Sequence, residues 1–145
     1  MKVEGSCHCG QIRYEAEVDP DKVVICHCTD CQMLSGSAFR TVVPTNAGTF
    51  KLLSGKPKSY VKTAESGNKR LQTFCPECGT PIYSGPVGDQ GRAVGLRVGT
   101  IRQRDRLIPS EQWWFRSAQG WIGNVPAIKR RDKQPAFDPE GGFSR

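Results

Sequence analysis

The sequence predicts a single, mostly β domain built from small sheets. Short segments of alternating apolar and polar residues are separated by turns, as in half-buried strands. The chain of 145 residues contains 16 glycines and 10 prolines, a composition typical of many turns. No segment shows the 3.6-residue apolar period of a long helix. We therefore expect strands, tight turns and at most short helical turns.

The N-terminal part shows this pattern most clearly. Residues 11–18 predict a half-buried strand, because apolar and polar residues alternate there. The apolar positions are Ile12, Tyr14, Ala16 and Val18. After a turn, the β-branched run at 23–25 predicts a second strand that ends at Cys26. Thr29 is expected to cap a short helical turn, which Gly36 would end.

Further strands are expected in the middle of the chain. Residues 50–53 and 59–61 predict a hairpin across the turn at 54–57. The other expected strands cover 39–43, 70–74, 82–83 and 94–98. The aromatic stretch 112–115, with Trp121 beyond it, is interpreted as core or sheet cover rather than as a surface on which a ligand stacks.

The C-terminal stretch differs from the rest of the chain. From residue 129 onward it is charged, rich in Pro and Gly and without periodicity, so we expect one domain at 1–128 and a flexible basic tail at 129–145. The net charge of +7 permits attraction to anionic partners, although Lys129, Arg130 and Arg131 carry part of it within this tail. Without a secretory segment or an apolar run of about 20 residues, a cytoplasmic location and no membrane partner are expected.

Seven cysteines carry the specific chemical signal. A reducing compartment disfavours structural disulfides, and an odd number suits them poorly, so metal binding is the expected role. Three cysteines lie close enough for one turn to direct their sulfurs at one soft cation; we call this group, Cys26, Cys28 and Cys31, the three-cysteine site. The other four form two pairs that are each followed by glycine, as in metal knuckles; we call this group, Cys7, Cys9, Cys75 and Cys78, the four-cysteine site.

The two groups predict different roles. Four thiolates saturate a tetrahedral zinc ion, so the four-cysteine site should be structural. Three thiolates leave one position for water or substrate, so the three-cysteine site should be catalytic. The residues expected to serve catalysis are Cys26, Cys28 and Cys31. Iron or another soft metal is an alternative to zinc at either site.

Two other readings of the cysteines stay open. In the first, His8, His27, Asp30 or water closes the three-cysteine site, and all seven cysteines only stabilise the fold. Both histidines lie between cysteines that face the metal, so their side chains are expected to point away from it. In the second, Cys75 and Cys78 form a redox-active dithiol, which the strand predicted after them disfavours because such motifs usually open a helix.

Several stretches resemble the glutathione-dependent formaldehyde-activating enzyme family, whose members include centromere protein V. The matching stretches are GSCHCG at 5–10, CHCTDC at 26–31, LSGSAF at 34–39, FCPECGT at 74–80 and VGTI at 98–101, and the likeness extends to about residue 125. One position departs from the family pattern. Relatives often carry histidine after the proline of the last motif, whereas Gln112 follows Pro109 here.

The resemblance implies a β-tent fold of small antiparallel sheets pinned by zinc. It implies two Zn²⁺ ions per chain, a structural one in the four-cysteine site and a catalytic one in the three-cysteine site. The family reaction joins glutathione and formaldehyde to give S-hydroxymethylglutathione. Basic side chains near the open site should bind the carboxylates of glutathione, and the candidates among which the sequence does not choose are Arg40, Arg70 and Arg97.

These inferences together predict an enzyme. It would be a zinc-dependent carbon–sulfur lyase, similar to S-hydroxymethylglutathione synthase, acting on a glutathione-like thiol and a small aldehyde or their adduct. The alternative is a non-catalytic zinc module that binds nucleic acid or protein through a basic surface. The sequence lacks a basic recognition helix, so nucleic acid is not the expected partner.

Overall fold

The computed structural model of this chain describes residues 1–88, 91–140 and 142–143, and it confirms a mostly β protein. The strands are β1 Lys2–Ser6, β2 Arg13–Glu17, β3 Val24–Cys26, β4 Arg40–Pro44, β5 Lys51–Ser54, β6 Lys58–Thr63, β7 Lys69–Phe74, β8 Pro81–Pro86, β9 Gly95–Arg97, β10 Glu111–Trp113, β11 Phe137–Asp138 and β12 Gly142–Phe143. The helical elements are α1 Thr29–Ser35 and the 3-10 turns Pro20–Lys22, Val98–Thr100, Arg104–Arg106, Phe115–Ser117 and Ile122–Ala127.

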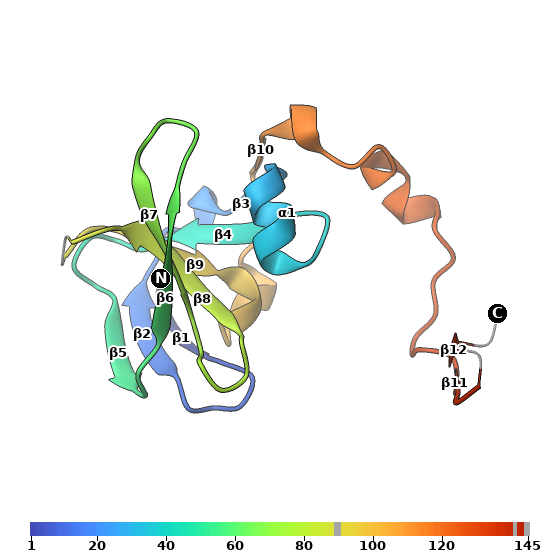
Figure 1. The fold of residues 1–145 in the computed structure, drawn as a ribbon, viewed down its shortest axis with the longest axis horizontal. Helices are drawn as coiled ribbons and strands as arrows, with labels where there is room; N and C mark the ends of the chain where they lie inside the picture. The colour runs from blue at the N-terminus through green and yellow to red at the C-terminus, as the bar shows by residue number, and fades with distance from the viewer. Residues whose placement is uncertain (89–90, 141, 144–145) are drawn as a thin grey trace.

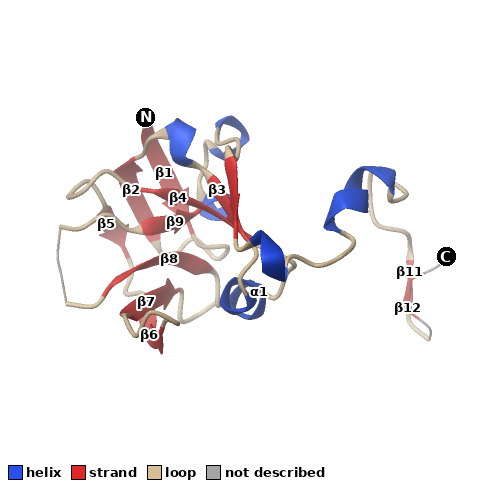
Figure 2. Cartoon of the chain, turned by 90° about the horizontal axis from the view of Figure 1, so that it is seen from above, coloured by secondary structure: helices blue, strands red, loops and turns tan. Residues whose placement is uncertain are grey.

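Two sheets form the body of the molecule (Figure 1). The smaller sheet has the strand order β1-β2-β5, and the larger has the order β10-β3-β4-β9-β8-β7-β6. Neighbouring strands are antiparallel except for β10 and β3, which run parallel. The chain beyond β10 leaves the body as an arm, which Figures 1 and 2 both show, and β11 and β12 pair with each other at its end.

The alternation predicted for residues 11–18 is confirmed by burial. Its four apolar side chains are all buried, and they are Ile12, Tyr14, Ala16 and Val18. Tyr14 packs against Phe50 at a ring-centroid distance of 5.5 Å, and Phe50 packs against Tyr83 at 4.9 Å. Because β2 carries Tyr14 while β8 carries Tyr83, this aromatic row joins the two sheets across the core.

The two faces of the larger sheet carry different kinds of side chains. On β4 and β9, Val43 pairs with Leu96, and both are fully buried in the core. The alternating side chains point to the opposite face, where Arg97 pairs with Val42. Arg40 lies on this face too, paired with Cys26 of β3. The strand register therefore gathers a thiol and two arginines on the face turned away from the core.

The hairpin predicted between 50–53 and 59–61 is wrong. β5 pairs with β2 of the smaller sheet, and β6 pairs with β7 of the larger one. The switch occurs at Gly55, which has a φ of +82° and lies against Gln11. Ser54 Oγ donates a hydrogen bond to the Gln11 carbonyl at 2.9 Å, which ties the end of β5 to the start of β2. The turn therefore moves the chain between sheets instead of reversing it.

Two other local predictions also need correction. The N-cap of α1 is Cys28 rather than Thr29, because Cys28 Sγ accepts a hydrogen bond from the Cys31 N–H at 3.3 Å. Gly36 ends the helix with a φ of 62°, as predicted. The aromatic stretch is not buried: the side chains that remain 44–58 % exposed are Trp113, Trp114, Phe115 and Trp121. They belong to β10 and the arm, which lie at the edge of the larger sheet.

No helix within the described residues is long and apolar enough to span a bilayer.

Candidate metal centres and the adjoining cleft

The four-cysteine site joins the end of β1 to the end of β7. Its four Sγ atoms, from Cys7, Cys9, Cys75 and Cys78, lie within 4.8 Å of one another. The separation is 3.5 Å between Cys7 and Cys9 and 3.8 Å between Cys9 and Cys75, and all seven cysteines of the chain are free of disulfides. Tetrahedral zinc with Zn–S bonds of about 2.3 Å requires sulfurs about 3.8 Å apart. The donor set and its spacing therefore fit one zinc ion.

Hydrogen bonds favour the thiolate form of two sulfurs at this site, those of Cys7 and Cys78. The Ile12 N–H donates to Cys7 Sγ at 3.2 Å, and Thr80 Oγ1 lies 3.1 Å from Cys78 Sγ. The Thr80 hydroxyl, together with the backbone N–H groups of Cys9 and Thr80, lowers the pKa of Cys78 to about 5. Gly10 has a φ of +81°, the left-handed conformation expected for this metal turn.

The three-cysteine site lies at the junction of β3 and α1. Cys26 ends β3, Cys28 caps the helix and Cys31 lies in its first turn, and the three Sγ atoms are within 4.8 Å of one another. A hydrogen bond from Cys31, supported by Cys28 and by the charge of Arg40, lowers the pKa of Cys26 to about 5, and the same interaction raises the pKa of Cys31. Three sulfurs thus converge, with one of them favoured as a thiolate at neutral pH.

No histidine or carboxylate of the described residues joins these three sulfurs as a fourth clustered donor. His27 is fully buried, its Nε2 lies 2.8 Å from Gln112 Oε1, and its ring packs edge-on against Phe115. Asp30 forms an ion pair with Lys62. Gln112 thus binds the imidazole of His27.

A cleft of about 750 Å³ opens beside the three-cysteine site, on the outer face of the larger sheet. Cys26 and Cys31 line it. All three arginines that the sequence offered as candidates also line it, namely Arg40, Arg70 and Arg97. Trp113 of β10 lines it as well, so part of the aromatic stretch faces the cleft instead of covering the core.

The floor of the cleft carries a residue that the sequence did not single out. Gln72 of β7 accepts hydrogen bonds through Oε1 from Arg40 at 3.2 Å and from Arg97 at 3.0 Å. Burial, together with the positive charge of Arg40, lowers the pKa of Arg97 to about 9. No sequence motif marks Gln72, because only the order of strands β9, β8 and β7 brings it to these arginines.

Two other glutamines, Gln32 and Gln119, hold the arm against α1. Gln32 donates hydrogen bonds from Nε2 to the His27 carbonyl at 2.7 Å and to the Ser117 carbonyl at 2.9 Å. Gln119 donates to Gln32 Oε1 at 2.7 Å. The His27 N–H also donates to the Trp113 carbonyl at 3.0 Å. These contacts fix β10, and with it Trp113, beside the three-cysteine site.

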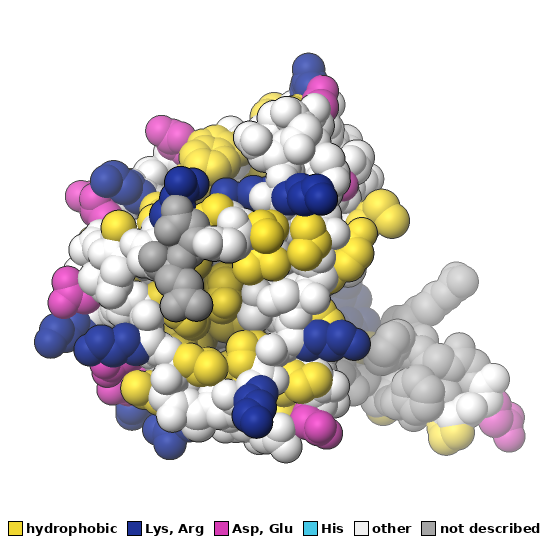
Figure 3. Space-filling view, turned by 60° about the vertical axis from the view of Figure 1, so that its left-hand side comes forward, with side chains coloured by type: hydrophobic (Ala, Val, Ile, Leu, Met, Phe, Trp, Pro, Cys, Tyr) yellow, Lys and Arg dark blue, Asp and Glu magenta, His cyan; other side chains and the backbone are white. Residues whose placement is uncertain are grey.

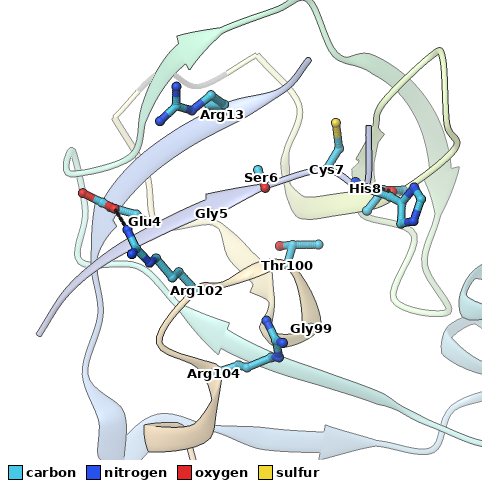
Figure 4. A pocket seen from close by; sticks show the side chains of 11 residues that line it. Glu4, Gly5, Ser6, Cys7, His8, Arg13, Gly99, Thr100, Arg102 and Arg104 are labelled. Carbon is cyan, nitrogen blue, oxygen red and sulfur yellow. Dashed lines mark hydrogen bonds and ion pairs between the residues drawn. The ribbon is translucent and has the colours of Figure 1, made fainter. Parts of the chain in front are cut away.

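Another cavity, of about 470 Å³, lies beside the four-cysteine site (Figure 4). Figure 4 shows Arg102 paired with Glu4, a contact of 3.6 Å, while Arg13 and Arg104 lie apart from each other. On the face drawn in Figure 3, the described Lys and Arg side chains are scattered around a group of hydrophobic ones and form no continuous basic patch. That face offers no extended surface for a polyanion.

Three comparisons with known proteins bear on these sites. The family model described as glutathione-dependent formaldehyde-activating enzyme matches residues 2–117. A curated protein of Schizosaccharomyces pombe, named an uncharacterized lyase, is 30 % identical over 80 residues, which is 55 % of this chain and 55 % of that protein. The match thus spans about half of that relative. A crystal structure of a Rhodobacter sphaeroides protein is 18 % identical, covers 77 % of this chain and 99 % of its own, and has a TM-score of 0.56, a likeness of fold alone.

Proposed function

This chain belongs to the glutathione-dependent formaldehyde-activating enzyme family, and from this membership we propose that it is a lyase-type enzyme acting on a glutathione-like thiol and a small aldehyde. In the forward direction the thiol sulfur bonds to the aldehyde carbon, and the thiol proton ends on the aldehyde oxygen. The product is a hemithioacetal such as S-hydroxymethylglutathione. The reverse reaction breaks the same carbon–sulfur bond. A β-tent arrangement of the sheets and a cytoplasmic location are part of this proposal.

The observation that carries the proposal is the position of the cleft. It reaches the sulfurs of Cys26 and Cys31, where three cysteines converge without a fourth clustered protein donor in the described chain. We assign catalysis to Cys26, Cys28 and Cys31, and a structural metal to Cys7, Cys9, Cys75 and Cys78. Bound zinc would supply a Lewis acid and a position for a thiolate.

The surrounding residues support this assignment. Arg40 lies opposite Cys26 in the β3–β4 ladder, so its positive charge favours thiolate at that position. Trp113 and the sheet wall line the cleft and would exclude bulk water from a bound substrate. The arm contacts made by Gln32 and His27 keep Trp113 in this position.

The proposal is tested by metal content and turnover in two serine variants. Cys28→Ser should reduce bound metal from two ions per chain to about one and abolish turnover of glutathione with formaldehyde, while the fold persists because serine also caps helices well. Cys78→Ser should lower the melting temperature strongly, since it removes a ligand of the closed site. Metal is measured by elemental analysis that includes zinc and iron, and turnover by NMR detection of the adduct.

Met33→Ser is the matched control. It introduces serine at an exposed position of the same helix, so metal content and turnover should stay close to wild type. Equal loss of melting temperature in Cys28→Ser and Cys78→Ser, with no turnover of any thiol and aldehyde pair by the wild type, would overturn the proposal.

A further inference from the structure

Two arginines on the cleft floor are buried as charged side chains. Arg40 and Arg97 are each only 7 % exposed, yet both line the cleft. One amide oxygen, Gln72 Oε1, accepts a hydrogen bond from each of them. The Nε atoms of both arginines are enclosed and have no hydrogen-bond partner. Burying charges in this way is costly unless an opposite charge compensates them.

No carboxylate of the described residues forms an ion pair with either arginine. The cleft does contain two carboxylates, those of Asp21 and Glu111. Glu111 accepts a hydrogen bond from Trp113 Nε1 at 2.8 Å, on the β10 side of the cleft. The positive charge of the floor is therefore left without a carboxylate partner from the protein.

Part of this charge is balanced by the neighbouring sulfurs. Three thiolates holding one dication carry a formal charge of roughly −1. Two guanidinium groups beside them carry two positive charges, because arginine stays protonated at neutral pH. Of the two buried guanidinium charges, one is therefore left for a bound anion, and a single carboxylate would compensate it.

The cleft above this floor has a volume of about 750 Å³, so it has room for such a group. Gly95 and Ser84 lie side by side between the arginine on β9 and the glutamine on β7. A Cβ atom at Gly95 would lie 2.9 Å from Val42 Cγ1 and 3.4 Å from Ser84 Oγ, so only glycine lets the Val42 side chain pack this closely against the strand. The sheet thus presents two guanidinium groups at the bottom of an open cavity.

We propose that Arg40, Arg97 and Gln72 form a carboxylate-binding site, which selects thiols or thiol adducts that carry a carboxylate over those that do not. Gln72 holds the two guanidinium groups together, and their remaining N–H groups bind the carboxylate oxygens. This inference rests on the proposed function for its account of the neighbouring three-cysteine site. The arginines of the other cavity differ, because Arg102 is largely exposed and already pairs with Glu4.

The test is a comparison of binding by calorimetry between glutathione and its diethyl ester, without aldehyde, to the metal-loaded protein. The wild type should bind the free acid about tenfold or more tightly than the ester, as expected for a charge-assisted hydrogen-bond pair. Gln72→Glu places a resident carboxylate between the two arginines, so it should reduce glutathione binding about tenfold and leave ester binding unchanged within about twofold. Its melting temperature should not fall, because the new charge compensates the arginines.

Two further variants complete the comparison. Arg97→Gln removes one charge of the site and should also abolish the preference for the free acid. Arg104→Gln removes one charge from the other cavity and should keep the full preference, which controls for net charge. Should Arg97→Gln fail to fold, Gln72→Glu still decides the question. Equal affinities of the wild type for acid and ester, or a preference that survives in Gln72→Glu, would overturn the inference.

Turnover measured in parallel separates this inference from the proposed function. A wild type that prefers the free acid but turns over no thiol with any aldehyde supports the carboxylate site and overturns the enzyme proposal. A wild type that turns over glutathione and its diester with the same KM supports the enzyme proposal and overturns the carboxylate site.

Discussion

Tyr14 is the largest fully buried side chain in the described part of the chain, and it links the fold to pH. Its hydroxyl lies 2.8 Å from Thr100 Oγ1. Burial raises the pKa of Tyr14 to about 12, against the smaller opposing effect of Thr100. Since the folded pKa lies above the unfolded value of about 10, the stability from neutral Tyr14 is complete below pH 10 and is lost as the pH rises from about 10 to about 12.

Tyr14→Phe should remove this part of the pH dependence. Between about pH 8 and about pH 11, the wild type should lose about 1 kcal/mol more free energy of unfolding than the variant, because only the wild type ionises this ring on unfolding. Urea unfolding at the two pH values measures the difference. Other titrating groups are common to both proteins and cancel. An equal decline in the two proteins would show that Tyr14 ionises alike in the folded and unfolded states.

At the residue scale, the grouping of the cysteines could be predicted because they are close in sequence. The residues that surround them could not, because they come from distant parts of the chain. Each sulfur group is built from pairs or triplets of cysteines within a few residues, so the sequence alone divided seven cysteines into the two clusters seen in the structure. The arginines of the cleft come from three different strands. Strand order and register decide that Arg40, Arg70 and Arg97 lie near the three-cysteine site. No sequence motif marked Gln72, which bonds to two of these arginines.

At the element scale, the pairing of β1 with β2 depends on a glycine. Gly5 pairs with Tyr14 in this ladder, and a Cβ atom at Gly5 would lie 2.1 Å from Tyr14 Cζ. No rotation of a flexible side-chain end relieves this contact, because the ring is enclosed by the core. Gly5→Ala should therefore lower the free energy of unfolding by about 2 kcal/mol or more.

Gly99→Ala is the matched control for this prediction. Nothing lies within 4 Å of a Cβ atom at Gly99, so the free energy of unfolding should change by less than about 0.5 kcal/mol. Chemical unfolding of both variants, monitored by circular dichroism, gives the comparison. A Gly5→Ala variant as stable as Gly99→Ala would mean that the Tyr14 ring moves aside at little cost.

A strand could be predicted from the sequence where its side chains alternate regularly between buried and exposed. The alternation of β2 survives in the structure because one face of that strand is wholly buried. The hairpin between 50–53 and 59–61 failed because two strands joined by a short turn can pair with each other or enter different sheets, and Gly55 against Gln11 selects the second outcome. The interpretation of the aromatic stretch as core was wrong, because hydrophobic character alone does not distinguish core residues from residues that line a cleft.

At the scale of the whole molecule, the core ends well before the chain does. The buried core residues lie between Val3 and Leu107, in the two sheets and their connections. Beyond them, β10 pairs with β3, and the arm is held through Gln32 of α1. Further along, Arg130 donates a hydrogen bond to the nearby Pro126 carbonyl, and β11 pairs with β12. The mostly β class followed from the alternating segments and the turn-rich composition, whereas the end of the core at Leu107 followed only from the contacts.

We propose that the domain ends near residue 128, and two truncations test this boundary. A chain of residues 1–128 keeps the whole core, β10 and the arm contacts to α1, so its melting temperature should stay within about 2 °C of the full chain. A chain of residues 1–110 ends just before β10 and loses the bond between Gln112 and His27 and that between Gln119 and Gln32. The loss leaves the buried His27 ring without Gln112 and leaves Gln32 of α1 without Gln119, so the melting temperature of this chain should fall by about 5 °C or more. Calorimetry measures both values, and an equal fall in the two truncated chains would place the tail at 129–145 within the folded domain.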